Sequence, residues 1–276
     1  MGWALERTAQ AGQLGYAWER ACPAITGSAG AIHAVARPFR GSPWRQAYGE
    51  GMLLMPHRFS IDARKAPLTL KQDIFNTFGP SIFERPVFYS QPGGLRFELS
   101  EQGSAIELFL QAMRKATVVC RDLFQGDELL VVCLQLHSNQ RGDFRRIYRA
   151  LGDAGIRIPA QRESWSEKTH PDDWFSEDEP EYQLYLAFEA PLSLLEPLLW
   201  CALASDFQAI RPKPRCAFFL FNLNKRLMVY PYDDRGMDVV GPGHEALCEL
   251  YEAHRGWLLD YDRQAMDAIF APAAGG

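Results

Sequence analysis

The sequence predicts a single α+β domain in which a mixed β-sheet with β-hairpins packs against several helices. Three observations carry this prediction: short alternating strands next to turn residues, long amphipathic helical segments, and one continuous apolar strand. Hairpins combined with helical crossovers imply a sheet with both antiparallel and parallel pairs. The chain has 276 residues, of which 47% are hydrophobic, and can therefore bury a sizeable core. We place this domain at residues 67–272.

The first elements should be a helix over 69–76 and then a hairpin. Pro86–Ser90 and Gly94–Leu99 resemble strands, and the turn residues Gln91–Gly94 between them favour a hairpin. Alternation in the second strand places Arg96 and Glu98 together on one face.

A long helix over 104–124 comes next, because apolar residues recur there at steps of three and four. Ser104 followed by Glu107 predicts a capping box at its start. The continuous apolar run over 128–136 predicts a central strand covered on both faces. The apolar face of the helix comprises Ile106, Phe109, Leu110, Met113, Ala116, Thr117, Cys120 and Phe124.

The second half alternates strands and helices. We expect a short basic helix over 142–152, a polar and acidic surface loop over 159–180, a strand over 181–188, an apolar helix over 192–207 and a strand over 216–221. The chain should close with a C-terminal cassette. The cassette consists of a hairpin over Tyr230–Asp238 and the segment Trp257–Arg263, and a helix around Leu247–His254 lies between them in the chain. In the second segment, Asp260 should be the N-cap of a last helix.

The turn of this cassette, Asp233–Gly236, has two interpretations. Aspartate starts turns and glycine ends them, so a tight turn with Arg235 bonded to a nearby carboxylate explains every residue type. Alternatively, Asp233, Asp234 and Asp238 could gather a divalent cation or a cationic partner residue.

Arg96 and Glu98 have a structural interpretation as members of a surface or cross-strand ion pair, worth at most about 1 kcal/mol if exposed. They would gain importance if their face borders a cleft that contains the Asp233–Asp238 turn. The candidate binding residues are therefore Arg96, Glu98, Asp233, Asp234, Arg235 and Asp238.

No motif indicates catalysis or a cofactor. The sequence has no C-x-x-C pair, no H-E-x-x-H motif, no phosphate-binding glycine loop and no G-x-S-x-G elbow. Most of the six cysteines lie in apolar runs, which predicts buried free thiols in a reducing compartment. We expect neither a cofactor nor, on balance, an enzyme.

Charge limits the partners. A net charge of −5 argues against general nucleic-acid binding. Six arginines between 141 and 162 precede an acidic segment at 163–181; the simplest interpretation is a solvated helix face that complements this segment. The neighbouring blocks of opposite charge also suit electrostatic steering of a protein partner.

No apolar run reaches the roughly 18 residues that span a bilayer, and no signal peptide is evident, so we expect no membrane partner and a cytoplasmic location.

Residues 1–54 differ in composition from the rest of the chain. They contain five arginines but no lysine, three glutamates but no aspartate, and 19 alanines and glycines. Such a shift suggests a poorly ordered leader, or upstream sequence read from an early start codon with Met55 as the true start. Under either interpretation we expect little stable packing before about residue 67.

Four segments together resemble the bacterial domain-of-unknown-function family 3885: Arg85–Tyr89, Gly94–Leu99, Tyr232–Asp238 and Trp257–Arg263. The resemblance covers about residues 70–271 and implies a bacterial, soluble protein with no established activity or cofactor. Because some members lie near secreted-toxin loci, it also implies a toxin-immunity role.

Two functional hypotheses remain. The first is a cytoplasmic interaction protein, such as an immunity protein that binds and blocks a toxin. The alternative is a small metal-dependent enzyme that uses Asp233, Asp234 and Asp238 as ligands, with Arg96 and Glu98 near the site.

Overall fold

The computed structural model describes residues 69–169 and 182–271, which all belong to one compact unit, Ile61–Gly276. The predictions about residues 1–54, a start at Met55 and weak packing before residue 67 lie outside these residues. So does the part of the predicted acidic loop that follows residue 169.

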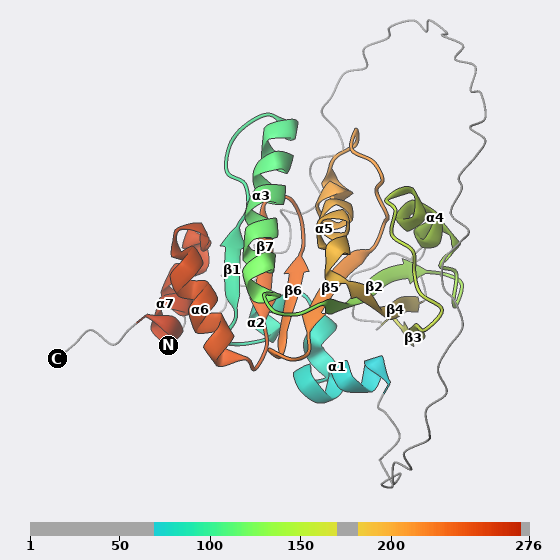
Figure 1. Ribbon diagram of the computed structural model, residues 1–276, viewed down its shortest axis with the longest axis horizontal. Coiled ribbons are helices and arrows are strands. Elements are labelled where there is room, and N and C mark those ends of the chain that lie inside the picture. Colours follow the sequence, from blue (N-terminus) through green and yellow to red (C-terminus); the bar gives the residue numbers. More distant parts are fainter. Residues whose placement is uncertain (1–68, 170–181, 272–276) are drawn as a thin grey trace, which may run out of the picture. The chain divides into compact units, whose positions relative to one another are not determined.

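The described residues confirm an α+β fold built on one seven-stranded sheet (Figure 1). The order across the sheet is β1-β7-β6-β5-β2-β4-β3, and every pair of neighbours is antiparallel. The strands are β1 Leu95–Glu98, β2 Leu129–Ser138, β3 Glu163–Lys168, β4 Tyr182–Pro191, β5 Ala217–Asn222, β6 Leu227–Pro231 and β7 Gly236–Val240.

The prediction of a mixed sheet was therefore wrong. The helical crossover between β4 and β5 does produce two strands that run the same way. However, β2 lies between them and is antiparallel to both, so no parallel pair forms. A helix between two strands indicates a parallel direction, but it does not indicate that the strands are neighbours.

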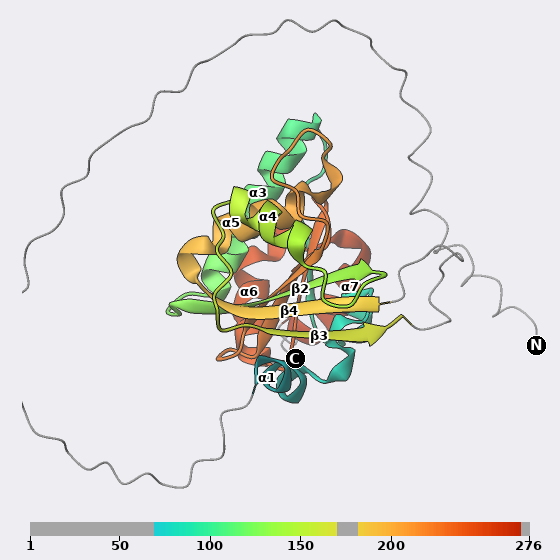
Figure 2. The ribbon, with the colours of Figure 1, turned by 90° about the vertical axis from the view of Figure 1, so that its right-hand side faces the viewer.

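The helices lie on both faces of the sheet. They are α1 Leu70–Phe78, α2 Val87–Ser90, α3 Ala105–Leu123, α4 Arg145–Asp153, α5 Leu195–Leu203, α6 His244–His254 and α7 Arg263–Phe270, with short 3₁₀ turns such as Pro80–Phe83 and Asp260–Asp262. Apolar residues from α3 to α7 pack on one face and form the larger core. Residues of α1 and of the turn after it cover the other face, on the opposite side of the strands (Figure 2).

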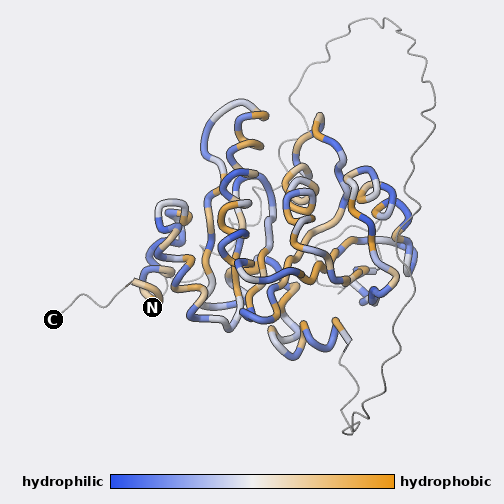
Figure 3. The backbone as a smooth tube through the Cα atoms, viewed as in Figure 1, coloured by the Kyte–Doolittle hydropathy of each residue, from blue (hydrophilic) through white to orange (hydrophobic). Residues whose placement is uncertain are grey.

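Local sequence signals explain several of these elements. Ser104 and Glu107 form the predicted capping box of α3: the Ser104 amide donates to Glu107 at 2.8 Å and the Glu107 amide donates to the Ser104 hydroxyl. Hydrophobic residues run along α5 and alternate with polar ones on α3 (Figure 3), because α5 is more deeply embedded than α3. The apolar run of β2 is buried as expected for a central strand.

The expected apolar face of α3 is only partly buried. Phe109, Ala116 and Cys120 lie in the core, whereas the side chains of Ile106 and Leu110 are 69% and 58% exposed. The first turns of α3 extend beyond the strands (Figures 1 and 2), so nothing in the sheet can cover these two residues.

The predicted hairpin of Pro86–Ser90 with Gly94–Leu99 was wrong. Residues Val87–Ser90 form one helical turn, and β1 pairs with β7. The free edge of β1 is occupied by the C-terminal cassette, because the Leu259 amide donates to the Arg96 carbonyl at 2.8 Å and Phe97 bridges Leu258. That edge therefore has no room for a second local strand.

Two smaller predictions also need correction. Residues Glu163–Lys168 are strand β3 rather than loop, since they pair with β4 at the edge of the sheet. The last helix starts after Asp262, not Asp260, and the side chain of this N-cap residue makes no capping bond. In the part of the chain that the structure describes, no helix is long and apolar enough to cross a membrane.

The described cysteines support the prediction of buried thiols. Cys120, Cys133 and Cys201 are buried and free, and Cys216 and Cys248 are partly buried and free. Burial raises the pKa of Cys120 and Cys201 to about 12, and it raises those of Cys133 and Cys216 as well. A thiol with a raised pKa is a poor nucleophile at neutral pH, so these four cysteines do not suggest catalysis.

Candidate functional site

Arg96 lies at the centre of a buried polar cluster on the sheet face that α1 and α2 cover. Its partner across the strands is Asp238 of β7, and the two side chains form a bidentate ion pair of 2.8 and 3.2 Å. A third Arg96 nitrogen donates to Asp262 at 3.0 Å. The side chains of Arg96, Asp238 and Asp262 are only 12%, 1% and 7% exposed.

The remaining carboxylate oxygens of the cluster are also bonded. Asp238 accepts a hydrogen bond from the Phe88 amide at 3.1 Å, and Asp262 accepts one from the Tyr89 hydroxyl at 2.9 Å. The rings of Phe88, Tyr89 and Tyr232 surround the Arg96 guanidinium at 4.8, 5.0 and 5.6 Å from their centroids. We call these six residues the Arg96 cluster. Its buried charges are paired and hydrogen-bonded, as burial requires.

The electrostatics of the cluster are a balance between burial and pairing. Burial lowers the pKa of Arg96, but the hydrogen bonds and charge of Asp238 outweigh it, so this pKa lies above its ordinary value. Burial raises the pKa of Asp238, and the bonds from Arg96 and the Phe88 amide oppose that effect. Each charge is therefore tolerated in the interior only because its partner is present.

The four sequence segments that carry the family resemblance meet in this cluster. Tyr89 comes from the first segment, Arg96 from the second, Asp238 from the third and Asp262 from the fourth. The C-terminal cassette thus contacts Arg96 through Asp238 and Asp262. Tyr89, Tyr232 and Asp262 are not among the site residues predicted from the sequence, because only the tertiary fold brings them to Arg96. The signal that could have indicated Asp262 is the repeated acidic residues of Trp257–Arg263.

The turn of the cassette follows the turn interpretation. The Asp233 carboxylate accepts hydrogen bonds from the amides of Arg235 and Gly236 at 2.8 and 3.0 Å, and from the Arg235 guanidinium at 2.9 Å. Asp233 is 7% exposed, so these bonds satisfy a buried carboxylate, whereas the Arg235 side chain is 79% exposed. The Asp233 side chain thus accepts a hydrogen bond from the amide two residues later, as in an Asx turn.

Asp234 lies beside this turn in an unfavourable environment for a charge. Its backbone carbonyl accepts from the Ser100 hydroxyl at 2.9 Å, and its carboxylate is 3.4 Å from the same hydroxyl. Burial, followed by the negative charges of Asp233 and Asp206, raises the pKa of Asp234. The environment of this carboxyl group therefore favours its protonated form.

The raised pKa of Asp234 predicts a pH effect. The folded protein holds this proton more tightly than the unfolded chain, so Asp234 makes stability fall as the pH rises from about 4 through the raised folded pKa. We expect D234N to remove that loss, so that the variant gains stability relative to the wild type as the pH rises to neutral. Urea unfolding of both proteins across this range measures the difference; a difference that stays constant or shrinks with rising pH would contradict the assignment.

Glu98 does not join the Arg96 cluster as a charge. Its backbone carbonyl accepts a hydrogen bond from the buried Lys115 ammonium at 3.0 Å, while in the described residues no cation lies within ion-pair distance of its carboxylate. Lys115 also approaches Glu101 at 3.4 Å. Of the two structural interpretations, a surface or a cross-strand ion pair, Arg96 follows the second through its pair with Asp238, and Glu98 follows neither among the described residues.

The three aspartates of the metal hypothesis do not converge. Asp238 is engaged by Arg96, Asp233 by its own turn, and Asp234 by Ser100. Within residues 69–169 and 182–271, no group of three or more histidine, cysteine or carboxylate side chains is placed to hold a metal. The geometry therefore offers no support for these residues as metal ligands.

This arrangement makes a direct prediction. Saturating Mg²⁺, Mn²⁺, Ca²⁺ or Zn²⁺ should leave the melting temperature unchanged, because a ligand must raise it if it binds only the folded state. Differential scanning fluorimetry with each chloride salt, and with EDTA as reference, measures this. A rise with one cation that disappears in D233N would restore the metal hypothesis.

A second polar cluster crosses the same sheet face. Arg85 donates to the Gln135 side chain at 2.8 Å and to the Tyr230 hydroxyl at 3.3 Å, and Gln135 donates to the Tyr185 hydroxyl at 3.1 Å. Gln135 is 3% exposed and lies within the apolar run of β2, where the sequence gives no sign of its partners. Its side-chain oxygen and nitrogen are both bonded, so this cluster too is complete within the fold.

The opposite side of the molecule has an open groove. It lies between α3, α5 and the end of α4, with a volume of about 590 Å³. Its apolar lining consists of Leu110, Met113, Ala154, Pro197, Trp200 and Pro212. Trp200 is held in place because its indole nitrogen donates to the Arg211 carbonyl at 3.2 Å and its ring meets Phe109 edge-on at 4.7 Å. We call this the α3–α5 groove.

Fold and site together define an α+β domain whose C-terminal hairpin and last helix are joined to the sheet edge by a buried arginine–aspartate cluster. The chain belongs to the family described as a domain of unknown function (DUF3885), whose model matches residues 70–262. No curated protein and no solved structure matches this chain.

Proposed function

We propose that this domain is a non-catalytic module that binds a partner protein through the α3–α5 groove. The observation that carries the proposal is the exposure of large apolar side chains at one end of α3. Ile106 and Leu110 lie one turn apart and are more than half exposed, and Leu110 continues into the groove with Met113. Exposed apolar patches beside a preformed hollow are typical of protein interaction sites.

The polar clusters support a binding role rather than catalysis. In the Arg96 cluster, and in the second polar cluster around Gln135, the hydrogen-bonding groups bond to other members of the same cluster. A catalytic acid, base or nucleophile needs a group that can reach a substrate, and these groups are already engaged. The α3–α5 groove, in contrast, is open, and its six apolar lining residues lie beside Asp153, Glu196 and Arg211.

Through the family resemblance, the partner that we propose first is a secreted toxin encoded beside this gene, which would make the domain a cytoplasmic immunity protein of a bacterium. Such a protein must bind tightly but needs no chemistry of its own. A large secreted-toxin gene directly upstream would agree with this proposal, and its absence would count against a toxin as the partner.

The proposal is tested by purification of tagged wild-type protein and of an I106D/L110D variant from the native host, followed by size-exclusion chromatography. We expect the wild type to elute with one defined partner and the variant to elute alone. L129D is the matched control, since Leu129 is 53% exposed at the start of β2 and away from the groove. A wild type that elutes alone, or a complex that survives I106D/L110D, would overturn the proposal.

A further inference from the structure

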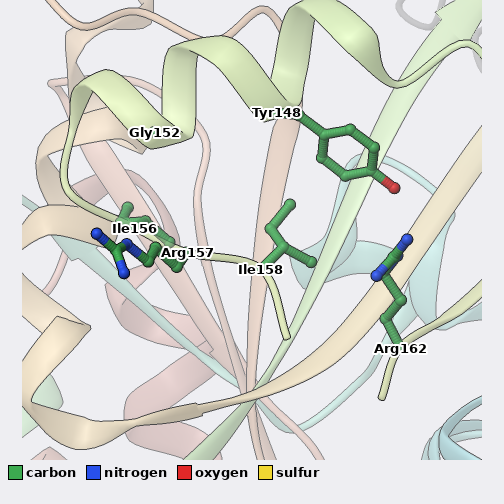
Figure 4. A pocket seen from close by; sticks show the side chains of 6 residues that line it. All are labelled: Tyr148, Gly152, Ile156, Arg157, Ile158 and Arg162. Atoms are coloured by element: carbon green, nitrogen blue, oxygen red, sulfur yellow. The ribbon is translucent and has the colours of Figure 1, made fainter. Parts of the chain in front are cut away.

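A second hollow opens between α4 and the start of β3 (Figure 4). Its volume is about 430 Å³, and its lining residues are Tyr148, Gly152, Ile156, Arg157, Ile158 and Arg162. Figure 4 shows Tyr148 extending from α4 above Ile158, with Arg157 and Arg162 on opposite sides of the hollow. The hollow thus combines apolar surface with two flanking positive charges.

Parts of the hollow are held in position. The guanidinium of Arg162 lies 5.7 Å from the centroid of the Tyr148 ring, and one of its nitrogens donates to the Pro159 carbonyl at 3.0 Å. A guanidinium carries five N–H donors, and within the described residues this is the hydrogen bond that Arg162 makes. A partly fixed arginine loses less conformational entropy when it binds a carboxylate than a freely rotating arginine does.

The surrounding segment is strongly positive in an acidic chain. Residues 141–162 contain six arginines and two aspartates, an excess of four positive charges, whereas the whole chain carries −5. Arg145 is paired with Asp143 at 3.0 Å. Among the described residues, no carboxylate lies within ion-pair distance of Arg146, Arg149 or Arg157.

The expected pairing of these arginines with the acidic segment 163–181 is not seen where that segment is described. Glu163 accepts a hydrogen bond from the Lys71 amide at 2.9 Å, and in β3 neither Glu163 nor Glu167 forms an ion pair with an arginine of α4. Residues 170–181 lie outside the described part. Among residues 69–169 and 182–271, no carboxylate forms an ion pair with Arg157 or Arg162.

This hollow adjoins the α3–α5 groove. Gly152 and Ile156 line the hollow, and Asp153 and Ala154, which lie between them in the chain, line the groove. One extended ligand that lies across the C-terminal end of α4 would enter both. The positive charge of the arginines beside the hollow then favours a negatively charged ligand, which apolar contact alone would not specify.

We propose that the α4–β3 hollow binds an acidic segment of the same partner protein, with carboxylates between Arg157 and Arg162 and an apolar side chain against Tyr148 and Ile158. This inference rests on the proposed function. Carboxylates on a protein are favoured over nucleic-acid phosphates because the hollow contains two isoleucines, against which an apolar side chain of a peptide can pack.

Two synthetic peptides of equal length provide the probe. Both carry leucines at helical spacing on one face; the other face carries glutamates in the first peptide and lysines in the second. Fluorescence anisotropy with the full-length protein at low and high salt measures their affinities. We expect the acidic peptide to bind at least about tenfold more tightly than the basic one, with a difference that shrinks at high salt.

Variants separate this inference from the proposed function. R157Q/R162Q should weaken the acidic peptide at least about tenfold and leave the basic peptide unchanged, whereas L110S should weaken both. R255Q is the matched control, because Arg255 is exposed and also lies over a tyrosine ring, that of Tyr251, at 5.4 Å. Thermal melts confirm that each variant is folded.

Each outcome decides between the two proposals. Equal binding of the two peptides, or acidic-peptide binding that survives R157Q/R162Q, overturns the inference but leaves the groove intact. Binding that survives L110S but not R157Q/R162Q supports the hollow and contradicts the groove. No binding of the acidic peptide, or tighter binding of single-stranded RNA than of that peptide, overturns the inference.

Discussion

R96M should lower the free energy of unfolding by about 3–5 kcal/mol at neutral pH, the largest effect that we expect from a single substitution. Methionine fills much of the same space but leaves Asp238 and Asp262 buried without a counter-charge. These carboxylates are 1% and 7% exposed, so water cannot replace the lost partner. Chemical denaturation monitored by tryptophan fluorescence measures the loss.

R235M is the matched control, because it also breaks an arginine–aspartate pair. The Arg235 side chain is 79% exposed, and surface pairs contribute at most about 1 kcal/mol. R96M combined with D238N and D262N should recover part of the loss, since the uncompensated charges are then removed. Equal effects of R96M and R235M would show that the Arg96 cluster does not hold the cassette.

D233A should lower the free energy of unfolding by about 2 kcal/mol, the second largest effect. The substitution leaves the amides of Arg235 and Gly236 without an acceptor, and the Gly236 amide is buried at the start of β7. An unsatisfied buried donor costs about 1–3 kcal/mol. Equilibrium unfolding in urea at neutral pH provides the measurement.

D234N is the control for this prediction, because it changes the adjacent carboxylate without removing the turn's acceptor. We expect it to be neutral or slightly stabilising, since burial, and then the charge of Asp233, raise the pKa of Asp234. A metal site would behave differently: removal of either aspartate would relieve carboxylate repulsion and stabilise the metal-free protein. Stabilisation by D233A would therefore contradict the turn assignment.

The elements that the sequence predicted correctly are those set by local signals. The capping box of Ser104 and Glu107 and the turn residues around Asp233 specify their structures through bonds within three residues. The apolar run of β2 identified a central strand because only a strand covered on both faces can bury such a sequence. These interactions need no knowledge of distant partners.

The elements that the sequence did not predict depend on long-range contacts. Val87–Ser90 has strand-like residues, but it forms a helical turn that aims the Phe88 amide at Asp238, far away in the chain. The antiparallel order of the sheet depends on the position of β2 between β4 and β5, which periodicity cannot reveal. The sequence predicts Asp260 as the cap of the last helix, but the helix starts after Asp262, and the Asp262 carboxylate accepts hydrogen bonds from Arg96 and Tyr89.

Ile106 and Leu110 illustrate the remaining limit. Their helical spacing matches that of the buried residues Phe109 and Ala116, so periodicity assigned them to the core. Their exposure follows from the length of α3 beyond the sheet, a property of the assembled fold. The disagreement is itself informative, because an apolar residue on a helix face that the fold leaves open marks surface suited to a partner.

We propose partner binding at the α3–α5 groove and a structural role for the Arg96 cluster, and site-specific photo-crosslinking in the native host compares the two directly. The crosslinker p-benzoylphenylalanine is placed at Leu110 in one protein and at Tyr261 in the other. Tyr261 is 85% exposed and lies next to Asp262 of the cluster, so both positions are accessible. The account predicts one dominant adduct with a different protein from position 110 and none from position 261. An adduct from position 261 without one from position 110 would contradict it.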